Sequence, residues 1–151
     1  MTTKTDVLEA INAVLVARWP RRTVYVNVCP TDFDRPSFWL RCLSDRIGDA
    51  SRAAIRHELK LELVLYDEPD DHYEVNWERL DRDTDTAAML LQAPLKVGSR
   101  RLLLTTETLP RDIDAAMIRI TTSWTDPRYA AAGGPVPEAE DASLSYRITI
   151  K

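Results

Sequence analysis

The residues of this sequence that could do chemistry are a glutamate and a lysine two positions apart. Glu58-Leu59-Lys60 matches the Glu-x-Lys end of a metal-dependent nuclease signature, in which the carboxylate holds Mg²⁺ and the lysine steadies the attacking water. That signature also needs an upstream aspartate at the end of a neighbouring strand. The aspartates available upstream lie in turn-rich stretches: Asp32, Asp34, Asp45 and Asp49. Alternating charges on a wet sheet face explain the pair more simply, so a nuclease is a minor alternative.

Neither the cysteines nor the histidines have the spacing of a metal site. Cys29 and Cys42 lie in apolar stretches without CxxC or Cys/His spacing, so we expect buried, reduced thiols. His57 and His72 are not three or four positions from each other or from a cysteine. His57 falls on the apolar side of its segment, which favours a hydrogen-bonded core or interface residue. The sequence predicts no catalytic residue, metal or cofactor.

Length and composition predict a single domain, and the net charge disfavours a protein that binds nucleic acid. The 151 residues are 44% hydrophobic and 29% charged, with four glycines, which suits a single core over residues 1–151. The net charge of −4 disfavours binding by general phosphate neutralisation. The first residues lack the layout of a signal peptide, and no apolar run approaches the roughly 20 residues of a membrane span. We therefore expect a protein made in the cytoplasm, without a membrane partner.

The sequence predicts four strands of four or more residues within residues 24–124. From Ile55 to Leu65, apolar residues alternate with charged ones, which predicts a long strand with one wet face. Shorter strands are predicted over 24–29 and 37–43, and a polar connection over 44–52 leads into the long strand. A further strand is predicted over 117–124, with Ile118, Ile120, Thr122 and Trp124 on one side.

Two amphipathic helices are predicted. The first runs from Thr5 to Trp19, with Thr5 or Asp6 as its cap and Pro20 as its stop. The second runs from His72 to Gln92, and Asp71 and Glu74 stand at capping-box spacing. Its expected buried residues are Tyr73, Trp77, Leu80, Ala87, Ala88 and Leu91. The stretch 95–104 indicates two short strands joined by a Gly-Ser turn.

The end of the chain differs in composition from the rest. Residues 126–142 are rich in Pro, Gly and Ala and acidic, which predicts a mobile loop. Residues 143–150 alternate again, with Leu144, Tyr146, Ile148 and Ile150 on one side, and predict a C-terminal strand. Together these elements predict an α+β fold, an antiparallel or mixed sheet with two main helices packed on one face.

Charge is distributed unevenly along the chain. Residues 67–85 carry nine acidic side chains against two arginines. A solvated helix with an acidic first turn explains this without any partner. Alternatively, the acidic helix meets a basic patch on a second copy and builds a ring through unlike surfaces. The candidate interface residues are Glu74, Glu78, Asp81, Arg18, Arg21, Arg22, Arg41, Arg100 and Arg101.

The order of these segments resembles that of a known family. The matching stretches are a helix ending in Trp19-Pro20, then 24–28, 33–40 (Phe-Asp-Arg-Pro-Ser-Phe-Trp-Leu), 58–66, 95–104 and 113–124. In this order and spacing the chain resembles the tail terminator, or tail completion, proteins of long-tailed bacteriophages and tail-like particles. Residues 126–151 depart from the family pattern.

The resemblance implies a structural virion protein and not an enzyme. Such a protein forms a hexameric ring that caps the tail tube, ends tail polymerisation and provides the surface for head joining. Its partners would be itself, the tail tube protein and the head connector or neck protein, with DNA passing through without specific binding. It would be assembled in the host cytoplasm and lie at the head-proximal end of the tail. The alternative is another head-tail joining (neck) component, and a Mg-dependent nuclease comes third.

Overall fold

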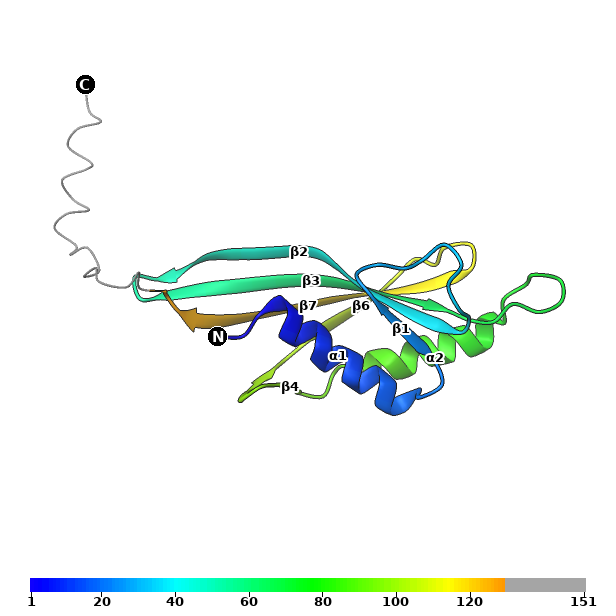
Figure 1. Ribbon diagram of the computed structural model, residues 1–151, viewed down its shortest axis with the longest axis horizontal. Coiled ribbons are helices and arrows are strands. Elements are labelled where there is room, and N and C mark those ends of the chain that lie inside the picture. The colour runs from blue at the N-terminus through cyan, green and yellow to red at the C-terminus, as the bar shows by residue number, and fades with distance from the viewer. Residues whose placement is uncertain (130–151) are drawn as a thin grey trace, which may run out of the picture.

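A computed structural model describes residues 1–129 (Figure 1), and the predicted loop over 130–142 and the predicted strand over 143–150 lie outside the described residues. In chain order the elements are α1 (Lys4–Arg18), β1 (Thr23–Val26), β2 (Ser37–Ser51), β3 (Ala54–Tyr66), α2 (Trp77–Leu90), β4 (Leu95–Val97), β5 (Arg100–Leu102), β6 (Thr105–Leu109) and β7 (Ala115–Pro127).

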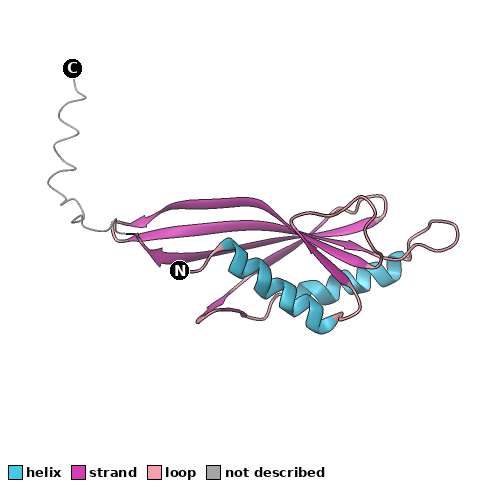
Figure 2. Ribbon diagram, viewed as in Figure 1, coloured by secondary structure: helices cyan, strands magenta, loops and turns pink. Residues whose placement is uncertain are grey.

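Five strands form one mixed sheet, and β4 and β5 form a separate small hairpin. The order in the larger sheet is β1-β2-β3-β7-β6. β1 runs parallel to β2, and the pairs β2-β3, β3-β7 and β6-β7 are antiparallel. Both helices lie on the same face of this sheet (Figure 2). The predicted α+β class, with two main helices packed on one face of the sheet, is confirmed.

The core lies between the sheet and the helices. The alternate leucines of β3 are buried, and the register sets Leu61 beside Ile120 and Leu63 beside Ile118 of β7. α1 packs against β1, β2 and β4, whereas α2 packs against β3, β6 and β7. The helices bury Val7, Leu8, Ile11 and Leu15 from α1 and Leu80, Thr84 and Ala87 from α2. One continuous apolar layer therefore holds the described elements together.

The first helix agrees with its prediction except at its cap. Thr3 is the N-cap: its hydroxyl accepts a hydrogen bond from the Asp6 N–H, and the Asp6 carboxylate accepts one from the Thr3 N–H. This reciprocal capping box satisfies N–H groups that would otherwise lack partners. At the other end, Trp19 packs on Phe38 of β2, with ring centroids 5.0 Å apart.

The second helix begins later than predicted, at Trp77. Its cap is Asn76, whose side chain accepts from the Arg79 N–H. Asp70 forms a local turn instead, because its carboxylate accepts from the backbone N–H groups of His72 and Glu74. In that turn Tyr73 has a φ of 61° and is 89% exposed. The predicted burial of Tyr73 is therefore wrong, because a competing side-chain hydrogen bond replaces the helical turn.

β2 is much longer than predicted. It runs without interruption through residues 44–51, which were expected to form a polar connection, and pairs with β3 up to Ser51 and Ala54. The pairing shifts between Cys42 and Ser44, which indicates a bulge. Beyond this point most β2 side chains are exposed, since the helices do not cover them. A strand wet on both faces has no apolar alternation, so periodicity could not detect it.

Other strand boundaries also need correction. β1 stops at Val26, and Asn27 follows with a φ of 65°, so the predicted strand to Cys29 is too long. β6 was not predicted, because the Thr-rich run 105–109 has no apolar alternation. β7 extends to Pro127, so the predicted loop does not begin at 126. The predicted hairpin over 95–104 is confirmed as β4 and β5.

Truncation of the central core contacts should destabilise the fold. Leu61→Ala and Ile120→Ala remove side chains that are fully buried and adjacent across β3 and β7. Each should lower the free energy of unfolding by about 2 to 5 kcal/mol, measured by urea denaturation. Ile113→Ala, at a side chain that is 92% exposed, is the control and should leave the urea midpoint nearly unchanged. Unchanged midpoints for both core variants would contradict this core.

Candidate functional site

The sheet face opposite the helices carries cross-strand ion pairs. Arg41 of β2 donates from Nε to Glu62 Oε1 of β3 over 3.0 Å. On the next pair of strands, Arg119 Nη1 lies 3.5 Å from Glu107 Oε2. Arg56 Nε lies 3.7 Å from Glu58 Oε1 along β3. Opposite charges thus face each other across this surface, which we call the bare face.

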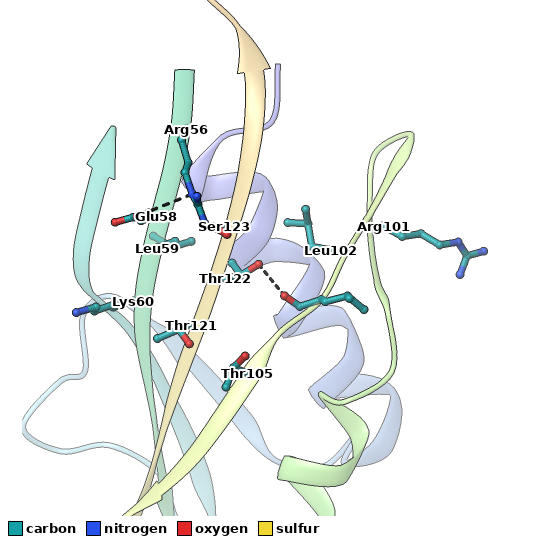
Figure 3. Close-up of a pocket in the computed structure, with 11 residues that line it drawn as sticks. Arg56, Glu58, Leu59, Lys60, Arg101, Leu102, Thr105, Thr121, Thr122 and Ser123 are labelled. Carbon is teal, nitrogen blue, oxygen red and sulfur yellow. Dashed lines mark hydrogen bonds and ion pairs between the residues drawn. The ribbon is translucent and has the colours of Figure 1, made fainter. Parts of the chain in front are cut away.

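The predicted Glu-x-Lys pair lies on the bare face, beside a shallow groove. The groove has a volume of about 570 Å³ and is lined by Glu58, Lys60 and a set of hydroxyl groups from β6 and β7. Figure 3 shows Lys60 and Arg101 pointing in opposite directions, away from the space between them. These cations therefore do not converge on a common ligand position.

The register also separates Glu58 from the upstream aspartates on β2. Arg46 is the cross-strand neighbour of Glu58, whereas Asp45 pairs with Leu59 and so belongs to the helix side of the sheet. Over residues 1–129, no three His, Cys, Asp or Glu side chains come together as a metal site. The geometry therefore gives Glu58 the surroundings of a surface ion pair rather than those of a metal ligand.

The acidic interface candidates are exposed on and before α2. Glu78 Oε1 accepts from Arg82 Nη2 over 3.1 Å, one turn along the helix. Asp81 lies 3.5 Å from Arg111 in the β6-β7 connection. Glu74 lies in the turn that precedes the helix. Pairs this exposed hold their partners weakly, so these carboxylates remain accessible to a second molecule.

The basic candidates divide into two groups. Arg22, Arg41 and Arg100 are committed within the chain: Arg22 pairs with Asp83 of α2, Arg41 with Glu62 and Arg100 with Asp126. A role of these three in a subunit contact stays a prediction, and each would have to keep or give up its intrachain ion pair. Arg18, Arg21 and Arg101 are exposed. Arg18 lies over the Trp19 ring at the end of α1, with Cζ 5.1 Å from the ring centroid.

The exposed basic candidates Arg18 and Arg21 lie at the C-terminal end of α1 and the acidic candidates Glu78 and Asp81 on α2, and we call these two sides of the helix layer its flanks. α1, with Arg18 at its end and Arg21 just beyond, packs beneath β1 and β2. α2, with Glu78 and Asp81, packs beneath β6 and β7 at the other side of the sheet (Figure 1). The candidate charges of the two flanks thus differ in sign, although α1 also carries the exposed acids Asp6 and Glu9.

A buried polar cluster links the far end of the sheet to the small hairpin. Asp126 is 1% exposed and accepts hydrogen bonds from the Trp124 indole N–H (3.1 Å) and from Arg100 (2.6 Å). His57 Nε2 lies 3.2 Å from the same carboxylate, and its ring stacks on Trp124. Arg100 also donates to the Thr125 carbonyl. Through Arg100, the β4-β5 hairpin is fixed to β7.

Sequence reasoning found one member of this cluster and missed the others. His57 was expected to be a hydrogen-bonded core or interface residue. Its burial agrees with this, but its Nε2, although 3.2 Å from Asp126 Oδ2, makes no hydrogen bond within residues 1–129. Asp126 was assigned to a loop, although it continues the alternation of Ile120, Thr122 and Trp124 by one more step. That continuation was the available signal.

Burial and hydrogen bonding oppose each other at Asp126. Burial by itself raises the pKa of the carboxyl group, but the Trp124 N–H, the Arg100 guanidinium and His57 together hold the pKa of Asp126 below its usual value. The charged form is thus the one that the folded protein favours.

Both cysteines are free, as expected, although they are half-buried rather than buried. Cys42 packs against the core. Burial raises the pKa of the Cys29 thiol, which disfavours the reactive thiolate.

Comparisons with known proteins give little guidance. No protein-family model matches the chain, and no curated protein matches it. A solved structure whose name describes no function resembles it at a TM-score of 0.42 and 12% identity, over 85% of this chain and 98% of the other. Of the helices in the described part, neither is long and apolar enough to cross a membrane.

Loss of the buried Asp126 charge should lower the stability of the fold and make that stability less dependent on pH. A carboxylate with a lowered folded-state pKa stabilises the protein above its unfolded pKa, and this stabilisation is lost as pH falls through the folded value. Asp126→Asn should therefore cost on the order of 3 kcal/mol at neutral pH, because Arg100 and His57 lose their charged partner. It should also reduce the stability difference between neutral and roughly pH 3, measured by urea denaturation.

Asp32→Asn, at an exposed carboxylate, is the matched control and should behave like the unmodified protein. If Asp126→Asn kept the full pH dependence of stability, another carboxylate would have to account for it.

Proposed function

We propose that this chain is the tail terminator of a long-tailed phage or tail-like particle. Copies would form a ring that caps the tail tube, ends its polymerisation and offers a surface for head joining. The observation that carries the proposal is the unlike charge on the two flanks of the helix layer, Arg18 and Arg21 on one and Glu78 and Asp81 on the other. The order of segments that resembles the terminator family adds to it.

Polarised flanks suit a contact between unlike surfaces. When one flank of a subunit meets the opposite flank of the next, each added copy presents the same free flank again. Such a heterologous contact closes into a ring if the rotation per subunit divides a full turn, and extends as a filament if it does not. The number six comes from the family resemblance alone.

The bare face is the surface we assign to the channel of this ring. Two of its arginines stand opposite carboxylates, in Arg41-Glu62 and Arg119-Glu107, whereas Lys60 lies between Ser44 and Thr121. A polyanion gains affinity by exchanging counterions for protein cations, and a cation already paired with a carboxylate contributes less. These paired arginines would therefore hold passing DNA only weakly, which suits a tail channel.

The flank contact predicts a charge-swap experiment. Changing Glu74, Glu78 and Asp81 to Lys should weaken self-association by on the order of tenfold or more, because like charges then face each other. Changing Arg18 and Arg21 to Glu should do the same. A chain that carries both sets of changes should regain association, since the flanks are complementary again. Analytical ultracentrifugation over a concentration series measures all three.

The control changes three other exposed acids, Asp32, Asp34 and Asp45, to Lys, and so adds the same total charge away from both α1 and α2. It should associate like the unmodified chain. Equal weakening by the control would mean that net charge, and not the flank contact, governs association. Failure of the combined variant to recover would count against direct pairing of the two flanks.

Loss of the protein tests the terminator role itself. An uncapped tube end keeps offering the surface to which the next tube ring adds. Particles that lack this protein should therefore have tails of irregular or excessive length that do not join heads, as seen by electron microscopy of lysates from a deletion strain.

The alternative, a neck component, predicts a different result in the same images. Its loss would leave tails of normal length beside separate heads, because termination would already have happened. A population of free tails with uniform, normal length would therefore rule out the terminator role.

A further inference from the structure

We propose that the sheets of neighbouring copies join edge to edge, with β6 of one copy antiparallel to the outer half of β2, residues 42–51, of the next. The inference rests on the proposed function and deepens it, because it names the backbone surfaces that would hold the ring together. Its grounds are two open edges at different heights of the sheet, complementary side chains on them and the poor fit of other pairings.

The first open edge is the outer half of β2. β1 pairs only with residues 37–40 of β2, and the Asn27 N–H adds a bond to the Leu40 carbonyl. From residue 42 to residue 51, the side of β2 away from β3 has no strand partner among residues 1–129. Such an edge presents a row of backbone donors and acceptors to any strand that reaches it.

The second open edge is β6, at the other side of the sheet. β6 is the last strand in the sheet order and pairs only with β7 among the described strands. Its residues Thr105, Glu107 and Thr108 are exposed. Three successive antiparallel pairs lead from β2 to β6, so these two strands run in opposite directions. Copies related by rotation keep these directions, and β6 of one copy therefore meets β2 of the next as an antiparallel neighbour.

The two edges lie at different heights, which suits the tilted strands of a closed sheet. Through β7, Glu107 of β6 is level with Glu62 of β3, whereas Arg46 of β2 is level with Glu58. These levels are about 13 Å apart along a strand, and the sheet from β2 to β6 adds about 19 Å of width per copy. Joining the edges in a ring therefore needs strands tilted by about 35°, which is usual for closed barrels.

The side chains of the two edges are complementary in this arrangement. Arg46 and Glu107 are both exposed, both belong to the bare face and would stand opposite each other across the junction. In the same register Ile47, which is 59% exposed, stands opposite Thr106 of the next copy on the helix side. Pairs of opposite charge and pairs of β-branched side chains stabilise antiparallel strands.

Pairing of two β2 edges across a twofold axis fits poorly. A register centred on Ile47 would put Asp45 opposite Asp49, and a register centred on Arg46 would put two copies of that arginine together. Like charges directly opposite each other destabilise antiparallel strands. The middle of the β2 edge therefore disfavours a second β2 and leaves β6 as the better partner.

The part of β7 beyond β6 is also a poor partner. The Thr122 hydroxyl donates to the Leu103 carbonyl over 3.0 Å, and Arg100 donates to the Thr125 carbonyl over 3.2 Å. The connection after β5 and the Arg100 side chain thus take positions that an added strand would need there. β6 itself carries no such contact from the small hairpin among residues 1–129.

Edge pairing also brings the two flanks of the helix layer together. α1 packs beneath β1 and β2, and α2 packs beneath β6 and β7. When β6 of one copy lies beside β2 of the next, α2 of the first copy lies on the side of α1 of the second. The flank contact of the proposed ring requires the same neighbours. A closed ring of this kind would leave neither edge open to uncontrolled pairing.

Backbone hydrogen exchange of the full chain tests the edge pairing. Exchange is compared between a dilute sample and a concentrated sample in which analytical ultracentrifugation detects assembly. On assembly, the amides of residues 43–51 that point away from β3 should exchange more slowly by on the order of tenfold or more. The β6 amides that point away from β7 should slow equally, whereas the amides of β3 should not change.

Every other outcome of this comparison overturns the edge pairing. Assembly with unchanged exchange at both edges would mean that copies associate through other surfaces, and the ring of the proposed function would stand without it. Protection of residues 43–51 alone would mean that β6 is not the partner. Protection of these amides already in the dilute sample would mean that the edge is not free for a second copy. Absence of assembly at every concentration would overturn the ring as well.

Charge exchange at the junction tests the register. Arg46→Glu should weaken self-association by on the order of fivefold, because two acids then face each other, and Glu107→Arg should do the same with two arginines. A chain with both changes should regain association. Arg56→Glu, the same change on the bare face of β3 and away from both edges, is the matched control and should associate like the unmodified chain. A combined variant that associates no better than the single variants would overturn the pairing of Arg46 with Glu107.

Discussion

The pairing of β3 with long strands on both sides is the constraint on which the rest of the structure depends. β3 is aligned with β2 from Tyr66 to Ala54 and with β7 over the same length. Because strand side chains alternate, this register fixes every second residue of three strands on the helix side at once. The helices pack on the part of the helix side where these strand residues are apolar. The opposite face of the sheet carries the charged side chains. A slip of one residue would expose the leucines of β3 and bury its charges.

This arrangement gives the subunit two unlike flanks as well as two unlike faces. The sheet is wider than either helix, so α1 covers the β1-β2 side and α2 covers the β6-β7 side. Surface charge that belongs to one helix therefore belongs to one flank. The Arg22-Asp83 pair joins the turn after α1 to α2 and fixes the helix layer where its halves meet. This inward ion pair thus ties the two helices together, and the outward charges of Arg18, Glu78 and Asp81 stay exposed.

Sequence patterns predicted the elements that bury an apolar side. α1, β3, the β4-β5 hairpin and the centre of β7 were found because alternation or helical spacing follows directly from burial. The outer half of β2 and the whole of β6 escaped, since their backbone hydrogen bonds depend on a partner strand and not on their own side chains. The start of α2 was misplaced because Asp71 and Glu74 have capping-box spacing, whereas in the folded chain Asp70 holds a local turn there and Asn76 caps the helix. Candidate interface residues were chosen by charge alone. Charge does not distinguish Arg18 from Arg22, whose ion pair with Asp83 is visible only in the folded chain.

The buried Asp126 cluster stabilises the fold and also places the Arg100 side chain along the edge of β7. Asp126 draws Arg100 onto β7, and the same guanidinium takes the Thr125 carbonyl. A side chain from the small hairpin thereby occupies part of β7 beyond the end of β6. No equivalent contact lies along Cys42–Ser51 of β2 in residues 1–129, apart from the Arg128 bonds at its tip. An open edge invites uncontrolled pairing unless something covers it. The Arg100-Asp126 contact thus makes β7 beyond β6 differ from the outer half of β2.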